Sequence, residues 1–162
     1  MQSINQKTIS SVAHLGAFSK YFIPFGNFLI PIIIWVLHKE KPFSSGHAKR
    51  ALNFQLSLFL YVSILITITL IGFLILRINL GQIDQFYISS GGDFVMNNHS
   101  PFFTSPFIIF IAIMLFLGLA IFLLEILCVI NATFRAREGK IYKYPLCINF
   151  IKLAPEELKD IE

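Results

Sequence analysis

One carboxylate stands inside an otherwise apolar stretch of this chain. Glu125 lies in the run 107–130, about 10 Å by helical rise from the end that carries basic residues. Ionisable groups inside membrane segments are candidates for function, because lipid penalises their charge. Two chemistries fit Glu125: a link in a proton relay, or a protonated acid whose hydrogen bonds lock two helices together. We favour the lock, because a relay needs a chain of partners and only amides are in sight.

Amide side chains precede the other long apolar run, 56–76, at its basic end. Asn53 and Gln55 enter the membrane there, at a depth similar to that of Glu125 on an antiparallel neighbour. We therefore predict a polar cluster of Asn53, Gln55 and Glu125, with Asn131 at its edge. Interhelical hydrogen bonds, each contributing about 1 kcal/mol in lipid, explain such a cluster as readily as a transport path does.

A second candidate site is a broken helix near the N-terminus. Pro24 and Gly26 interrupt the apolar segment 21–37, and Asn27 follows them directly. Broken membrane helices line binding cavities, and Asn27 is the polar group that such a cavity would present. The alternative is a simple kink that suits packing, which is the more frequent role of proline and glycine in membrane helices.

Signatures of the common enzyme classes are missing from the sequence, which contains no HExxH, GxSxG, Walker or GxGxxG motif. His14 and His47 lack metal-type spacing with an acid or a cysteine, and Cys128 and Cys147 form no CxxC pair. We expect no catalytic residue, no metal site and no cofactor, and therefore a protein that is not an enzyme.

The composition places these residues in a membrane. Of 162 residues, 56% are hydrophobic and 14% are charged, against about 25% charged in soluble domains. The runs 56–76 and 107–130 are each long enough to cross a bilayer as a helix, which takes about 20 apolar residues. The net charge of +4 arises beside apolar runs, where cations meet lipid head groups rather than nucleic acid. We predict an all-α, polytopic membrane helical bundle that forms one domain over 1–162.

Three transmembrane helices and a short N-terminal fourth helix are expected. The spans cover about 21–37, 46–77 and 107–134, and the short helix covers about 9–18. Lys20 would be costly at mid-membrane, so 9–37 is not one span. The short helix either lies on the outer surface, with the N-terminus outside, or enters from the cytoplasm and turns near Lys20.

Basic residues orient the bundle, because positive residues in short loops stay on the cytoplasmic side. The expected topology anchors are Trp35, Lys39, Lys49, Arg50, Arg135 and Arg137. The loop 81–106 contains Asp84 and Asp93 and no lysine or arginine, so it faces outward. The tail 135–162 is cytoplasmic, and its last part, 155–162, is expected to be solvated.

Several short motifs, taken in order, resemble a known family. They are His14-Leu15, Ile23-Pro24-Phe25-Gly26-Asn27, Pro31 with Trp35, Lys39, the run 47–55 and Tyr144-Pro145-Leu146. Over roughly 12–150 the chain resembles an uncharacterised bacterial membrane-protein family, distantly grouped with the twenty-kilodalton Tic component of chloroplast protein import. The resemblance implies a four-helix bundle with a short first helix, a cytoplasmic N-terminus and the bacterial inner (plasma) membrane. The loop 81–106 is longer than the resemblance implies, and Glu125 matches no motif of that family.

Three functions remain open. A non-catalytic helper or scaffold subunit of a membrane complex is favoured by the small-residue face on which Gly118 and Ala132 flank Glu125 at seven-residue intervals. A small oligomeric channel or transporter around the Glu125 cluster is the first alternative, and a lipid-acting enzyme is the second. Expected partners are membrane lipids and either another protein or further copies in a homo-oligomer.

Overall fold

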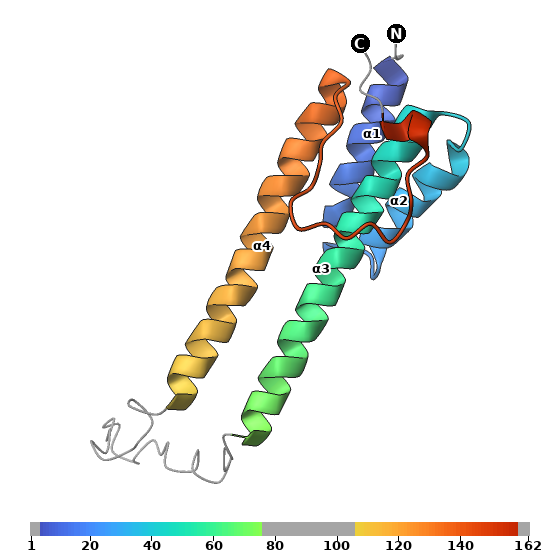
Figure 1. The fold of residues 1–162 in the computed structure, drawn as a ribbon. Coiled ribbons are helices and arrows are strands. Elements are labelled where there is room, and N and C mark those ends of the chain that lie inside the picture. Colours follow the sequence, from blue (N-terminus) through green and yellow to red (C-terminus); the bar gives the residue numbers. More distant parts are fainter. Residues whose placement is uncertain (1–3, 76–105, 159–162) are drawn as a thin grey trace. The chain divides into compact units, whose positions relative to one another are not determined.

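The computed structural model describes residues 4–75 and 106–158, and every regular element in these ranges is a helix (Figure 1). In chain order they are α1 (Ile4–Leu15), the 3-10 helix η1 (Gly16–Tyr21), α2 (Gly26–Leu37), α3 (Pro42–Ile75), α4 (Pro106–Glu138) and the 3-10 helix η3 (Pro155–Leu158). The predicted all-α class is confirmed. The predicted outer loop, 81–106, lies outside the described residues except for its last position.

The two long helices have proline at their first position, where the missing N–H would have no partner in the helix anyway. At the other end of α4, Gly139 adopts a left-handed φ of 85°. The amides of Gly139 and Lys140 donate to the carbonyls of Ala136 and Arg135, so the last turn is closed by a glycine cap. Within the described residues, two helices are long and apolar enough to cross a membrane: Pro42–Leu74 and Ile108–Glu138.

The third predicted span, over 21–37, is not confirmed. Its helix, α2, has 12 residues, which amounts to about 18 Å against a hydrocarbon core of about 30 Å. The helix cannot begin earlier because the chain breaks between η1 and α2, where Phe25 takes a left-handed φ of 60° beside Pro24. Gly26 then starts α2 tightly against Ser19, since a Cβ at this position would lie 2.5 Å from the Ser19 hydroxyl.

The chain divides into two compact units, each described here by itself. Unit 1 contains Met1–Tyr61 and Ile121–Glu162. In it α1 leads into η1, and α2 turns back beside α1 (Figure 1). Small residues such as Ala13 and Ala48 let these short helices approach the first part of α3, while Phe54 and Val129 fill the core between α3 and α4.

Unit 2, Val62–Ala120, holds the last part of α3 and the first part of α4. Its closest fit is at Gly72, where a Cβ would lie 2.2 Å from the Phe110 ring. Thr67 and Thr69 donate their hydroxyl hydrogens to carbonyls one turn earlier in their own helix. Among the described side chains of this unit, every one is at least partly exposed.

Candidate functional site

Glu125 forms an ion pair that bridges α4 and η1. The carboxylate is buried, with 5% of its residue surface exposed. Lys20 places its Nζ 2.7 Å from Oε1 and 2.5 Å from Oε2. From the sequence, Lys20 was expected only to prevent a continuous membrane span. In the structure its ammonium group is the counter-charge of Glu125. The geometry is that of a salt bridge, in which the Lys20 ammonium donates to both carboxylate oxygens.

Two amides extend this ion pair across two further helices. Gln55 of α3 donates from Nε2 to Glu125 Oε1 at 3.1 Å, and Asn27 of α2 donates from Nδ2 to Gln55 Oε1 at 2.9 Å. We refer to Lys20, Asn27, Gln55 and Glu125 as the Glu125 network. It draws one side chain from each of η1, α2, α3 and α4, and it unites the predicted polar cluster with the predicted broken-helix site.

The other members of the two predicted sites lie elsewhere. Asn53 is fully buried but binds the backbone of Ile151, and Asn131 is exposed on α4. Asn53 cannot share the environment of Gln55, because side chains two residues apart on a helix do not face each other. Pro24 is exposed in the turn before α2, and Gly26 is buried against Ser19.

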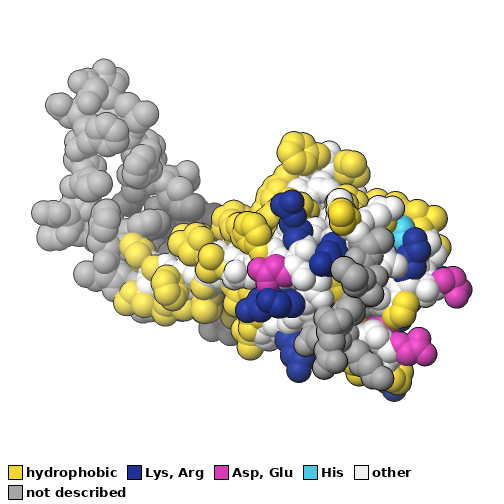
Figure 2. Space-filling model, turned by 90° about the horizontal axis from the view of Figure 1, so that it is seen from above, with side chains coloured by type: hydrophobic (Ala, Val, Ile, Leu, Met, Phe, Trp, Pro, Cys, Tyr) yellow, Lys and Arg dark blue, Asp and Glu magenta, His cyan; other side chains and the backbone are white. Residues whose placement is uncertain are grey.

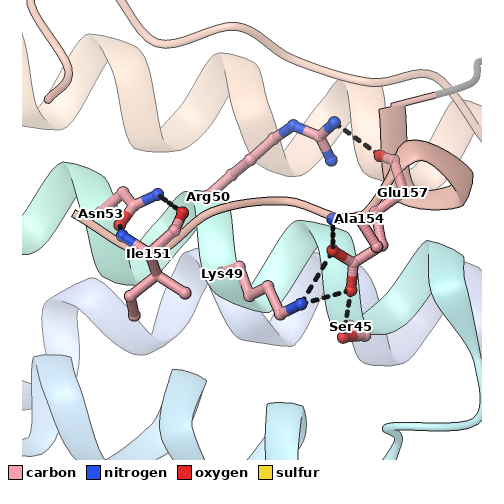
Figure 3. Close-up of polar contacts among 7 residues, drawn as sticks. All are labelled: Ser45, Lys49, Arg50, Asn53, Ile151, Ala154 and Glu157. Atoms are coloured by element: carbon pink, nitrogen blue, oxygen red, sulfur yellow. Dashed lines mark hydrogen bonds and ion pairs between the residues drawn. The ribbon is translucent and has the colours of Figure 1, made fainter. Parts of the chain in front are cut away.

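Asn53 belongs to a line of polar residues along one face of α3. The line, which we name the α3 stripe, consists of Ser45, Lys49, Asn53, Ser57 and Tyr61, spaced by four residues. The C-terminal tail covers it, with non-helical chain over 146–151 and with the 3-10 helix η3 at its end. The amide of Ile148 donates to Ser57 Oγ at 2.8 Å, and the Tyr61 hydroxyl donates to the Leu146 carbonyl at 2.7 Å. Asn53 holds Ile151 at both backbone atoms, at 2.8 and 2.9 Å (Figure 3).

Glu157 anchors the end of this tail. Its carboxylate accepts hydrogen bonds from Ser45 Oγ at 2.6 Å, from Lys49 Nζ at 2.9 Å and from the Ala154 amide at 2.7 Å (Figure 3). Arg50 donates to the Glu157 carbonyl at 2.7 Å. Burial by itself would raise the pKa of Glu157, but these donors outweigh it and hold the pKa below its ordinary value of 4.5. The expectation of a solvated tail end is therefore wrong for Glu157, which is 6% exposed.

A buried aromatic and imidazole cluster lies between α1, α3 and the start of the tail. His14 Nε2 is 2.8 Å from His47 Nδ1, and the Tyr144 hydroxyl is 2.8 Å from His14 Nδ1. The Tyr144 ring stacks on Phe54 with centroids 4.1 Å apart. Among the described residues, no group of three or more His, Cys, Asp or Glu side chains could hold a metal ion.

The predicted topology anchors lie on α2, α3, α4 and the loop between α2 and α3. Lys39, Arg135 and Arg137 are exposed, and Figure 2 shows lysine and arginine side chains on the face of the molecule seen from above. Lys49 and Arg50 instead turn to the tail, and the Lys49 ammonium also lies 5.4 Å from the centre of the Trp35 ring.

Comparison with known proteins identifies the family. A model of the MamF/MmsF magnetosome magnetite crystal formation protein family matches residues 5–151, which include both long helices and the whole Glu125 network. The chain belongs to this family. Membership, together with the two long apolar helices, supports a location in a bacterial membrane. No curated protein and no solved structure gives a significant match.

The family confirms only part of the resemblance drawn from the sequence. The chain does belong to a bacterial membrane-protein family, but no relationship to the chloroplast Tic component is shown. Of the residues in the sites described above, Glu157 lies beyond the matched range and the Glu125 network lies inside it. Signals for the missed residues were present in the sequence: Lys20 is a cation between two apolar segments, as Glu125 is an acid within one.

Proposed function

We propose that this protein is a non-catalytic scaffold or helper subunit of a bacterial membrane complex, acting in the process that the family's name describes, magnetite crystal formation. The Glu125 network carries the proposal. Its charged and amide groups bind one another across four elements, so they serve to hold the helices in one arrangement. Polar contacts of this kind specify helix packing in lipid, where apolar contact alone favours no particular neighbour.

The same network supports a topology for the N-terminal third. Helices α1 and α2 have 12 residues each, about 18 Å, which is a little over half of the hydrocarbon core. We infer that α1, η1 and α2 form a hairpin that enters the membrane from the cytoplasm and returns. The N-terminus is then cytoplasmic, the second of the two arrangements left open by the sequence. Lys20, in the turn, reaches the bilayer interior with its counter-charge already in place.

A scaffold needs surface for its neighbours, and this chain exposes apolar surface on its short helices. Leu29, Ile33 and Val36 of α2 are 46%, 52% and 52% exposed, and Phe22 and Phe25 in the preceding turn are 88% and 69% exposed. In a membrane these side chains contact lipid or another protein, because water would disfavour so large an apolar area. Lipids and a protein partner are therefore the proposed contacts of this surface.

Purification of the tagged protein in a mild detergent tests the scaffold function. We expect a second membrane protein to copurify at a fixed ratio. The variant Phe22→Ser with Phe25→Ser should lose that partner while keeping the fold, since both side chains are exposed. Leu123→Ser, at an exposed position of α4, is the matched control and should keep the partner. A homogeneous protein with no partner at any detergent concentration would contradict the scaffold function.

The ion pair favours a second candidate, a small oligomeric channel or transporter. A Lys–Glu pair with a buried carboxylate and attached amides is also the kind of group that lines an ion path. Lys20→Met with Glu125→Gln separates the two functions, because it removes both charges together and leaves no charge unpaired. A stable double variant that still binds the partner supports the scaffold. Ion flux in liposomes of the native chain that disappears in this stable double variant supports the channel.

A further inference from the structure

The α3 stripe recognises its tail mainly through backbone atoms. Asn53 binds both backbone polar atoms of Ile151, Ser57 accepts from the Ile148 amide, and Tyr61 donates to the Leu146 carbonyl. The side-chain anchor among these contacts is the Glu157 carboxylate, six residues beyond the position held by Asn53 (Figure 3). Such a surface can accept the same segment from another molecule as well as its own.

The start of the tail contains a strained hinge. Tyr144 is fixed by its stacking on Phe54 and its hydrogen bond to His14. Two residues later, Leu146 adopts a left-handed φ of 53°, which is unfavourable for a residue with a side chain. Opening this turn would release the strain and carry 147–158 away from its own molecule, and strained hinge loops favour exchange of segments between copies.

The outward side of the tail is apolar. The exposed fraction is 70% for Leu146, 39% for Ile148, 50% for Phe150 and 59% for Leu158. These side chains are exposed although the tail runs along the polar α3 stripe. Exposed apolar side chains of this kind mark contact with lipid or with another protein. Two tails that cross between neighbouring copies would bring their apolar sides together and bury them.

From these three observations we propose that the tail 147–158 is exchanged between two copies of this chain, each tail occupying the α3 stripe of the other. Exchange keeps every contact of the tail and relieves Leu146 in both hinges, so its free-energy cost is small. The proposal deepens the scaffold function by naming a second copy as one of its partners, and it rests on that function.

A native cysteine provides a direct test. Cys147 directly precedes Ile148, whose amide donates to Ser57 Oγ at 2.8 Å, so Ser57→Cys places a second thiol next to Cys147. One tagged copy carries Ser57→Cys, Cys147→Ser and Cys128→Ala, and a second, differently tagged copy carries only Cys128→Ala. After coexpression and mild oxidation in the membrane, we expect a disulfide that joins the two tags.

Two control variants make this result decisive. A single chain with Ser57→Cys, Cys128→Ala and native Cys147 should form the disulfide in full, whichever copy supplies the tail. Moving the new cysteine to the exposed position Asn131, with Ser57 native, reports random collisions. Complete crosslinking of the single chain without any disulfide between tags would overturn the proposal. An equal yield from Asn131→Cys would also overturn it, and so would failure of the single chain to crosslink.

Hinge variants supply an independent measurement. Leu146→Gly removes the strain from the closed turn, and we expect the exchanged fraction to fall by about tenfold. Leu146→Val adds a β-branched side chain to the same backbone and should raise that fraction. Equal fractions in both variants would overturn the role of the hinge. Copurification of a foreign partner without any exchange would contradict this inference and leave the scaffold function standing.

Discussion

The two units of this protein each contain part of α3 and part of α4, but different interactions hold the helices together in each unit. In unit 1, polar side chains from four elements meet in the interior, among them Lys20, Gln55 and Glu125, and several are less than 10% exposed. In unit 2, the described side chains are all at least partly exposed, and Thr67 and Thr69 bond to carbonyls of their own helix. One unit specifies its packing by hydrogen bonds and ion pairs, and the other by close apolar fit.

The difference follows from the solvent. Lipid tails are as apolar as leucine, so burial of apolar side chains gives helices in a bilayer little preference for one another. A polar side chain, in contrast, must find its partner or remain unsatisfied in lipid. In unit 1, the elements α1, η1 and α2 are each too short to span the membrane, and the polar links hold them in place.

The largest expected effect comes from breaking the ion pair of unit 1. Glu125→Leu leaves Lys20 without its counter-charge, and we expect the free energy of unfolding to fall by about 3 kcal/mol. Adding Lys20→Met should restore most of the loss, since no unpaired charge then remains. Leu119→Ala, at an exposed position of unit 2, is the control and should change the free energy of unfolding by less than about 0.5 kcal/mol. Denaturation in a mild detergent measures all three, and equal losses in the single and double variants would count against the ion pair.

Removing the amide that holds the tail should have the next largest effect. Asn53→Leu leaves the Ile151 amide and carbonyl without partners, at an expected loss of about 2 kcal/mol. Asn131→Leu changes the same residue type at an exposed position of α4 and should be neutral. Protease cleavage after Lys152 should become faster only in the first variant. Similar cleavage in both variants would show that Asn53 does not hold the tail.

A smaller effect tests the close fit of unit 2. Gly72→Ala brings a Cβ against the Phe110 ring, and we expect a net loss of about 1 kcal/mol because the ring must shift. Gly118→Ala meets nothing closer than Leu65, at 3.8 Å, and should be neutral or stabilising, since alanine favours a helix. Equal stability of the two variants would mean that the fit at Gly72 does not contribute.

The smallest effect concerns pH and is confined to unit 1. Glu157 has a lowered pKa in the folded protein, so the unfolded chain takes up the proton first as the pH falls below 4.5. Stability is therefore present above pH 4.5 and is lost on acidification. Between pH 5 and pH 4 the loss stays below about 1 kcal/mol, since one group changes stability by at most about 1.4 kcal/mol per pH unit. The slope of stability against pH should flatten in Glu157→Gln, and an unchanged slope would exclude this carboxylate.

Local patterns were enough to predict the helices, but their partners were not predictable. Apolar runs indicated α3 and α4 over about 46–77 and 107–134, within a few residues of the observed Pro42–Ile75 and Pro106–Glu138. The span over 21–37 was overestimated because apolarity continues through Pro24, where the backbone turns. Gln55 was placed beside Glu125 from its depth, while Asn53, two residues away, was grouped with it although it points to another face of α3.

The sequence by itself determined the class of this protein, because apolar runs of sufficient length and basic flanks are properties of continuous segments. Only the tertiary structure decided that Lys20 pairs with Glu125, 105 residues away, and that Glu157 returns to the start of α3, 112 residues from Ser45. Such pairings depend on how the chain turns at Phe25 and Gly139, and they bring together charges that are costly alone and stable together.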